Sequence, residues 1–148
     1  MTATTPSSVA VAELLVAAIQ AGGVKGVKRI AAAVQVPIIA GVETGYGNEN
    51  NIARTVAVYE SAGVAALHIE GQEWPKRCGF MEGKRVIPKD DMASKIEAAA
   101  GRSNPGHVII GRTDALAPNG WDDALARASF RSPSTGTSTL LSHLFRVC

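Results

Sequence analysis

The sequence predicts an α/β fold with about three central parallel strands, and two observations carry this prediction. Three short apolar runs, rich in β-branched residues and bounded by turn signals, lie at residues 36–40, 64–70 and 107–111. Their continuous apolar character is typical of strands that are covered on both faces, as in parallel sheets. Helical patterns lie between these runs. The resulting order αβαβαβα favours right-handed crossover connections.

The helical patterns have recognisable starts and ends. The second pattern repeats apolar residues at spacings of four and three and ends at Gly63, which is suited to a helix C-terminus. The third follows Pro88 and two aspartates, which favour a helix start. The four predicted helices cover residues 24–34, 50–62, the segment after Pro88 that carries Met92, Ile96 and Ala99, and residues 121–128.

Composition and charge exclude several classes of protein. The chain has 148 residues, of which 46% are hydrophobic and 19% charged, as is ordinary for one soluble globular domain. A formal net charge of +2 gives no indication of nucleic-acid binding. Cys78 and Cys148 lie in unrelated contexts and predict no disulfide framework, so we expect a reducing, cytoplasmic location.

The two ends of the chain differ from its centre. Residues 9–21 are apolar, but Glu13 interrupts them and they are shorter than the roughly 20 residues needed to span a bilayer. We expect residues 1–23 to form a divergent N-terminal helix and no membrane contact. Residues 129–148 are rich in Ser and Thr and contain no acidic residue, which predicts a poorly ordered tail. A short helix over residues 140–147 is an alternative.

Polar segments that contain glycine follow the predicted strands. They cover residues 43–48, 71–79 and 112–114. In parallel α/β folds the carboxyl ends of the strands carry the chemistry. The sequence therefore predicts a functional site where these three segments meet.

These segments belong to three longer motifs that resemble a known family. The motifs are VPIIAGVETGYGNE at residues 36–49, LHIEGQEWPKRCGFM at residues 67–81 and VIIGRTDALAP at residues 108–118. Together they are similar to the isocitrate lyase/phosphoenolpyruvate mutase superfamily, especially its 2-methylisocitrate lyase and oxaloacetate hydrolase-like branch. The resemblance covers residues 24–128 and implies part of a TIM-like (β/α)8 barrel. A whole barrel takes about 250 residues, so we expect a truncated member.

The resemblance implies an activity and a cofactor. Family lyases break a carbon–carbon bond in a small 2-hydroxy or 2-oxo di- or tricarboxylate, and Mg²⁺ holds the 2-oxo acid part. Here Glu43 and Glu70 match metal-site carboxylates of the family. The position of the direct metal ligand is Gly41, which has no side-chain oxygen. Gly71 and Phe80 depart from the family pattern as well.

The resemblance also assigns residues to catalysis and substrate binding. Cys78 matches the loop cysteine that protonates the carbanion, although an inert cysteine is the alternative. Arg112 matches an arginine that binds the substrate carboxylate, with a salt bridge to Asp114 as the alternative. His68 is expected to be a packed core residue. The expected substrate-binding residues are Thr44, Gly45, Tyr46, Gly79 and Arg112.

Three interpretations follow. The first is a divergent Mg²⁺-dependent lyase. The second is a catalytically inactive fragment or pseudoenzyme, which forms a homo-oligomer or pairs with a full-length paralogue. The third is a different α/β enzyme that binds phosphate at the loop between Gly45 and Gly47, but this interpretation does not explain the Lys-Arg-Cys-Gly segment.

Overall fold

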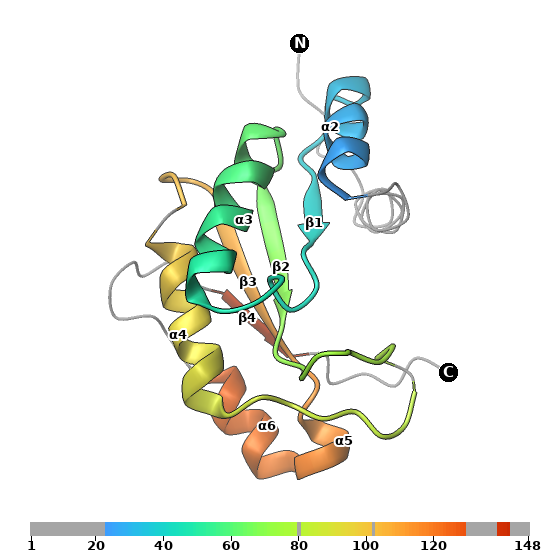
Figure 1. Cartoon of the computed structure of the whole chain (residues 1–148), viewed down its shortest axis with the longest axis vertical. Coiled ribbons are helices and arrows are strands. Elements are labelled where there is room, and N and C mark those ends of the chain that lie inside the picture. Colours follow the sequence, from blue (N-terminus) through green and yellow to red (C-terminus); the bar gives the residue numbers. More distant parts are fainter. Residues whose placement is uncertain (1–22, 80, 102, 130–138, 143–148) are drawn as a thin grey trace, which may run out of the picture.

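Within the described residues the sheet contains four parallel strands in the order β1-β2-β3-β4. The computed structural model describes residues 23–79, 81–101, 103–129 and 139–142. Helices connect the first three strands, as Figure 1 shows. The elements are α2 (Gly23–Ala33), β1 (Ile39–Gly41), α3 (Glu49–Ser61), β2 (Ala66–Glu70), α4 (Lys89–Ala100), β3 (Val108–Thr113), α5 (Leu116–Asn119), α6 (Trp121–Ala128) and β4 (Thr139–Ser142).

The parallel register brings the carboxyl ends of the strands together. Gly41 pairs with His68, and Glu70 pairs with Arg112. In Figure 1 the strands run downward, and the long segment between β2 and α4 lies at their lower ends, close to α5. Polar residues that end one strand are therefore neighbours of those that end the next.

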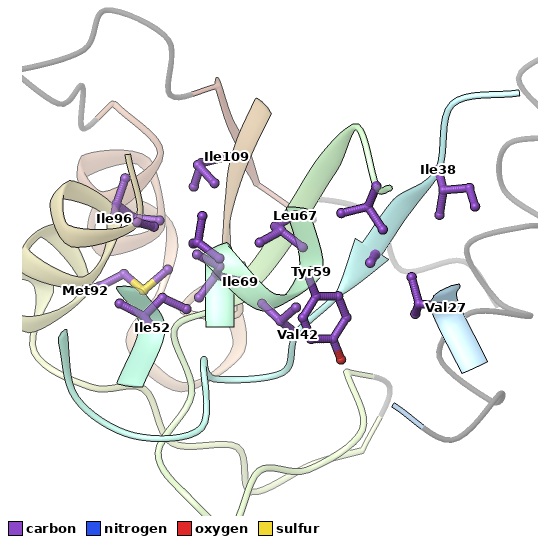
Figure 2. Packing of buried hydrophobic residues seen from close by; sticks show 14 residues of the cluster. Val27, Ile38, Val42, Ile52, Tyr59, Leu67, Ile69, Met92, Ile96 and Ile109 are labelled. Atoms are coloured by element: carbon purple, nitrogen blue, oxygen red, sulfur yellow. The ribbon is translucent and has the colours of Figure 1, made fainter. Parts of the chain in front are cut away.

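Helices α3 and α4 pack against each other and supply much of the hydrophobic core. Ile52 of α3 and Ile96 of α4 are almost fully buried, as is Leu67 of β2 (Figure 2). Burial of one such side chain stabilises the fold by about 1.5–3 kcal/mol. The core thus fixes the positions of the strand ends that carry the polar residues.

Local sequence explains where α3 begins and ends. The Asn48 side chain accepts hydrogen bonds from the backbone N–H groups of Asn50 and Asn51, while the Asn51 side chain accepts one from the Asn48 backbone. This reciprocal capping satisfies donors that the helix leaves unpaired. Past the other end, Gly63 has φ +89°, a conformation that glycine adopts at little cost.

The predicted strands and helices are present, with shifted ends and one addition. Strand β1 begins at Ile39, two residues after Pro37, and β3 continues through Arg112 to Thr113. The prediction of a helix from residue 140 was wrong for residues 140–142, because Thr139–Ser142 form β4. The β4 backbone pairs with β3, so it covers a sheet edge whose peptide groups would otherwise be exposed.

Two other expectations concern the remaining parts of the chain. The expected N-terminal helix of residues 1–23 and the rest of the tail lie almost wholly outside the described residues. Within the described ranges, no helix has the length and apolar character needed to cross a membrane.

Candidate active site

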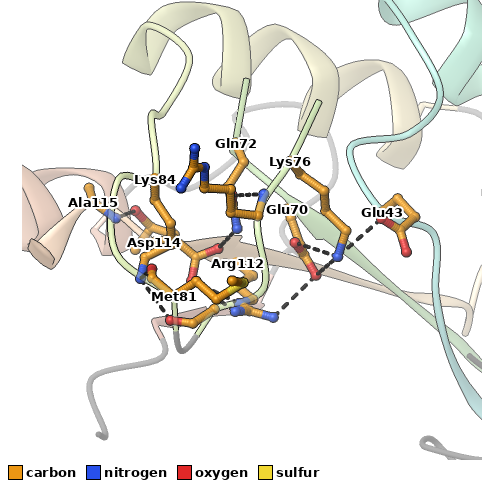
Figure 3. Close-up of polar contacts among 12 residues, drawn as sticks. Glu43, Glu70, Gln72, Lys76, Met81, Lys84, Arg112, Asp114 and Ala115 are labelled. Atoms are coloured by element: carbon orange, nitrogen blue, oxygen red, sulfur yellow. Dashed lines mark hydrogen bonds and ion pairs between the residues drawn. The ribbon is translucent and has the colours of Figure 1, made fainter. Parts of the chain in front are cut away.

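Three acidic or basic side chains from successive strand ends meet at one edge of the sheet. Glu43 follows β1, Glu70 ends β2 and Arg112 lies near the end of β3. The Glu70 N–H donates to the Glu43 carbonyl over 2.8 Å, which ties the first two strand ends together. Figure 3 shows the side chains pointing toward one another, with Lys76 between the two glutamates.

Lys76 is the cation that joins the two glutamates. Its Nζ lies 3.0 Å from Glu43 Oε2 and 3.3 Å from Glu70 Oε2. Burial of the ammonium lowers the Lys76 pKa, but the hydrogen bond to Glu43 and the charge of Glu70 outweigh this effect. The net pKa therefore lies above the ordinary lysine value of 10.5. Lys76 is held in its charged form at neutral pH.

Arg112 bridges Glu70 and Asp114. Its Nη1 lies 3.1 Å from Glu70 Oε1, while its Nε and Nη2 donate to Asp114 Oδ1 over 3.2 and 2.8 Å. The guanidinium has five N–H donors, so these contacts leave two of them for a ligand. Its side chain is 15% exposed and is thus reachable from solvent. The salt bridge to Asp114 considered for this arginine exists and orients its planar fork.

Gln72 is a residue of this site that the sequence did not reveal. It is 1% exposed, and its Nε2 donates to Asp114 Oδ2 over 2.8 Å. Its Oε1 accepts a hydrogen bond from the Arg77 N–H. Gln72 therefore links Asp114 to the loop that carries Cys78. Its place two residues after the end of β2 is the sequence signal that could have indicated this role.

The loop that carries Cys78 lies against Arg112. A Cβ at Gly79 would be 2.3 Å from Arg112 Nη2, so glycine permits this approach. Lys84 Nζ donates to the Gly79 carbonyl over 2.7 Å and holds the loop in place. Cys78 is exposed and makes no disulfide within the described residues. Its neighbour Arg77 donates to the Glu82 carbonyl.

The loop after β1 contains a strained turn. Glu43 and Tyr46 have φ of 54° and 60°, values that side chains other than glycine adopt at a cost. Gly45 has φ +83°, and a Cβ there would collide with Ile52. The Thr44 carbonyl accepts a hydrogen bond from Lys95, a lysine whose pKa is lowered by burial. Gly45 thus allows close packing against Ile52, and Thr44 contributes a backbone hydrogen bond to Lys95.

Tyr46 contacts a different part of the protein. Its hydroxyl lies 3.4 Å from that of Tyr59 on α3, and half of the residue is exposed. Burial, the hydrogen bond with Tyr59 and the nearby Glu43 charge raise the Tyr46 pKa. The structure thus brings together Glu43, Glu70, Lys76, Gly79, Arg112 and Asp114, whereas it gives Tyr46 a contact with α3.

Sequence comparison identifies the family. A profile of the family described as phosphoenolpyruvate phosphomutase matches residues 6–132. The chain belongs to this family. It is also 48% identical over 99 residues to 2,3-dimethylmalate lyase of Eubacterium barkeri, a match that covers 66% of this chain and 34% of that protein. The chain therefore spans about a third of the length of such curated relatives.

Solved structures of the superfamily share the fold. The structure of oxaloacetate acetylhydrolase in complex with 3,3-difluorooxalacetate has a TM-score of 0.76 and 34% identity, covering 83% of this chain and 43% of that one. A complex of phosphonopyruvate hydrolase with oxalate and Mg²⁺ has a TM-score of 0.69 and 28% identity, covering 81% and 41%. The described strands and helices are thus part of a TIM-like barrel of the phosphoenolpyruvate mutase/isocitrate lyase superfamily.

The metal site that the family implies does not fit the residues present. Glu43 and Glu70 are close, but the Lys76 ammonium lies between them, and Gly41 supplies no side-chain ligand. Among the described residues no three His, Cys, Asp or Glu side chains gather in a way that could hold a metal ion. Mg²⁺ requires near-ideal octahedral coordination, which two carboxylates already paired with an ammonium do not provide.

Proposed function

We propose that this chain carries part of a carbon–carbon lyase site for a small 2-hydroxy or 2-oxo di- or tricarboxylate, such as 2-methylisocitrate. The observation that supports this proposal is the meeting of Lys76, Arg112 and the Cys78 loop at the carboxyl ends of β1, β2 and β3. Two cations and a thiol at one sheet edge suit an anionic substrate that must receive a proton.

Arg112 and Lys76 would bind the substrate carboxylates. Two N–H donors of Arg112 are free within the described contacts, and charge-assisted hydrogen bonds are about twice as strong as neutral ones. Asp114 holds the guanidinium in place and is itself held by Gln72. This chain of contacts would orient the substrate without large reorganisation.

Cys78 would act as the general acid. When the carbon–carbon bond breaks, its electron pair stays on the carbon next to a carboxylate, and the Cys78 thiol donates its proton to that carbon. The hydroxyl of the other fragment loses its proton to water as it becomes the carbonyl of a 2-oxo acid, and the Cys78 thiolate then regains a proton from water. The exposed position of Cys78 gives the thiol access to a substrate bound by Arg112.

Magnesium dependence is a separate prediction. In relatives such as phosphonopyruvate hydrolase the metal is present together with oxalate. In this chain we assign the metal-site carboxylates to Glu43 and Glu70, and the Lys76 ammonium lies between them. We therefore assign no step of the reaction to a metal ion.

A second candidate is a carboxylate-binding protein without turnover. Gly41, at the position assigned to the direct metal ligand, favours it because glycine has no side-chain oxygen. The outer edge of β1 pairs with no other strand in the described ranges, so assembly with a copy of itself or with a full-length paralogue belongs to this candidate. Light scattering of the purified protein measures that assembly.

Product formation distinguishes the two candidates. The purified full chain is incubated with 2-methylisocitrate, isocitrate, 2,3-dimethylmalate or oxaloacetate, with and without Mg²⁺, and the 2-oxo acid or oxalate is measured by chromatography. A lyase should yield product that Cys78→Ser abolishes, while the matched control Cys148→Ser retains it. Absence of product with all four compounds, from protein shown to be folded by circular dichroism, would reject the lyase in favour of the binding protein.

A further inference from the structure

We propose that Lys95 of α4 is a positioning residue for the site at the carboxyl ends of the strands, because it holds the turn after β1 in its functional shape. This turn covers residues 43–47 and carries Glu43, whose carboxylate belongs to the site. Lys95 lies outside the three sequence motifs. The inference rests on the proposed function, because the turn borders the same site, and it extends that function to helix α4.

A hydrogen bond between α4 and the turn carries the first step. Lys95 Nζ donates to the Thr44 carbonyl over 3.2 Å, although the two residues are 51 positions apart in the sequence. Thr44 is 5% exposed, and no other described residue donates to its carbonyl. A buried carbonyl that loses its donor destabilises the conformation that buries it. Removal of the lysine would therefore favour a different conformation of the turn.

Two neighbouring peptide groups of the turn are fixed by hydrogen bonds. The Glu43 carbonyl accepts one from the Glu70 N–H over 2.8 Å, which fixes the first group. In the second, the Gly45 N–H donates to the Val42 carbonyl over 2.8 Å, while Lys95 donates to the carbonyl of the same group. A peptide group is planar, so contacts at both of its ends set its orientation. Lys95 thus helps to set the path of the chain through the turn.

The conformation that Lys95 holds is an unfavourable one. Glu43 and Tyr46 have φ of 54° and 60°. Such values persist only where surrounding contacts enforce them. Glu43 Oε2 lies 3.0 Å from Lys76 Nζ, so relaxation of the turn would move this carboxylate away from the lysine. Lys95 therefore acts on the site through the backbone of the turn.

The partial burial of Lys95 is consistent with this role. Burial lowers the Lys95 pKa, and this effect outweighs the charges of Glu49 and Asp91, which raise it. An ammonium that has lost part of its water forms a stronger hydrogen bond with a carbonyl. A lysine that only covered the surface of a helix would keep its ammonium in water. The bond to the turn thus offsets the cost of removing Lys95 from solvent.

Hydrogen exchange of the full chain, followed by NMR, tests the inference without a ligand. We expect the Gly45 amide to exchange about tenfold faster in Lys95→Met, because the turn loses one of its contacts, whereas amides of β2 and β3 keep their rates. Lys95→Arg retains a charged donor and should restore slow exchange. The matched control is Lys28→Met, which removes the same charge from an exposed position of α2. Unchanged exchange at Gly45, or faster exchange in all strands, would overturn the inference.

Calorimetric titration with oxalate in the presence of Mg²⁺ connects the turn to the site. Oxalate is the probe because it is bound with Mg²⁺ in the phosphonopyruvate hydrolase structure. We expect Lys95→Met to bind oxalate about tenfold more weakly than the wild type, and Lys95→Arg to bind it as the wild type does. Should circular dichroism show that Lys95→Met is poorly folded, Lys95→Gln replaces it, with the same expected loss.

The outcomes separate this inference from the proposed function. Equal oxalate affinity in the wild type and the neutral variants, or no oxalate binding by the wild type, would overturn the inference. Equal product formation by the wild type and Lys95→Met would overturn it while supporting the lyase. Weaker oxalate binding by Lys95→Met, together with no turnover by the wild type, would support it while rejecting the lyase.

Discussion

The backbone of Gly79 lies so close to the guanidinium of Arg112 that a Cβ at this glycine would be 2.3 Å from Arg112 Nη2. Asp114 and Glu70 form ion pairs with that guanidinium, so it cannot move away from Gly79 without losing these ion pairs. The Cys78 loop and the proposed carboxylate-binding arginine are thus fitted to each other. A substitution in the Cys78 loop should therefore affect Arg112, and a substitution at Arg112 should affect the loop.

A methyl group at position 79 should separate these two parts. We expect Gly79→Ala to weaken oxalate binding by about tenfold, equivalent to 1.4 kcal/mol, because the arginine fork or the loop must move. Calorimetry measures this effect. The control is Gly71→Ala, whose Cβ would meet Met92 Sδ at an ordinary 3.4 Å. Equal oxalate affinity in wild type and Gly79→Ala would contradict the fitted contact.

Removal of the Arg112 charge should destabilise the fold. In Arg112→Met, Asp114 and Glu70, whose side chains are only 5% and 9% exposed, would lose their shared cation. Breaking such a buried pair costs about 3–5 kcal/mol of unfolding free energy. Urea denaturation measures the loss. Arg85→Met is the matched control, because the Arg85–Glu73 pair is largely exposed and should change stability by less than about 1 kcal/mol.

Lys76 should make stability depend on alkaline pH. Because the pKa of Lys76 is raised in the folded protein, its pairing contributes stability that is complete below the unfolded value of 10.5 and is lost as pH rises through the folded value. The difference in unfolding free energy between wild type and Lys76→Met should therefore shrink above pH 10.5. Denaturation curves across this range, with Lys28→Met as control, measure it. A constant difference would argue against the ion pairs.

Asp123 should make the stability of the fold depend on acidic pH. The hydrogen bond from Asn119 and the contact with Arg127 lower the Asp123 pKa below its ordinary 3.8, despite some desolvation. Its stabilising effect is thus present above pH 3.8 and lost as pH falls through the folded value. Asp123→Asn should be less stable than wild type at neutral pH and equal to it in strong acid. Asp122→Asn, at an exposed neighbouring position, is the matched control, and thermal unfolding of both variants measures the effect.

Much of the fold follows from local sequence patterns. The apolar runs predict β1, β2 and β3 because strands buried on both faces need continuous apolar residues. The start of α3 at Asn48 and its end before Gly63 follow from capping chemistry. By contrast, β4 is set by pairing with a distant strand edge, and no period in the Ser/Thr-rich tail indicates it.

The candidate site is predictable in outline only. Register in a parallel sheet brings Glu70 beside Arg112, so their proximity follows from the strand assignments. The position of Lys76 does not, because it depends on how the loop after β2 folds back toward Glu43. Gln72 was missed because a single polar residue after a strand resembles any solvated loop residue, whereas here it is buried.

The strained turn after β1 is linked to Lys76 through the carboxylate of Glu43. Glu43 keeps its φ of 54° while its carboxylate is anchored to Lys76. Such a conformation persists only when surrounding contacts enforce it. A ligand that draws Lys76 away would release one of these restraints, so the turn would relax and its amide protons would exchange faster with solvent. The rigidity of the turn after β1 therefore depends on which groups Lys76 contacts.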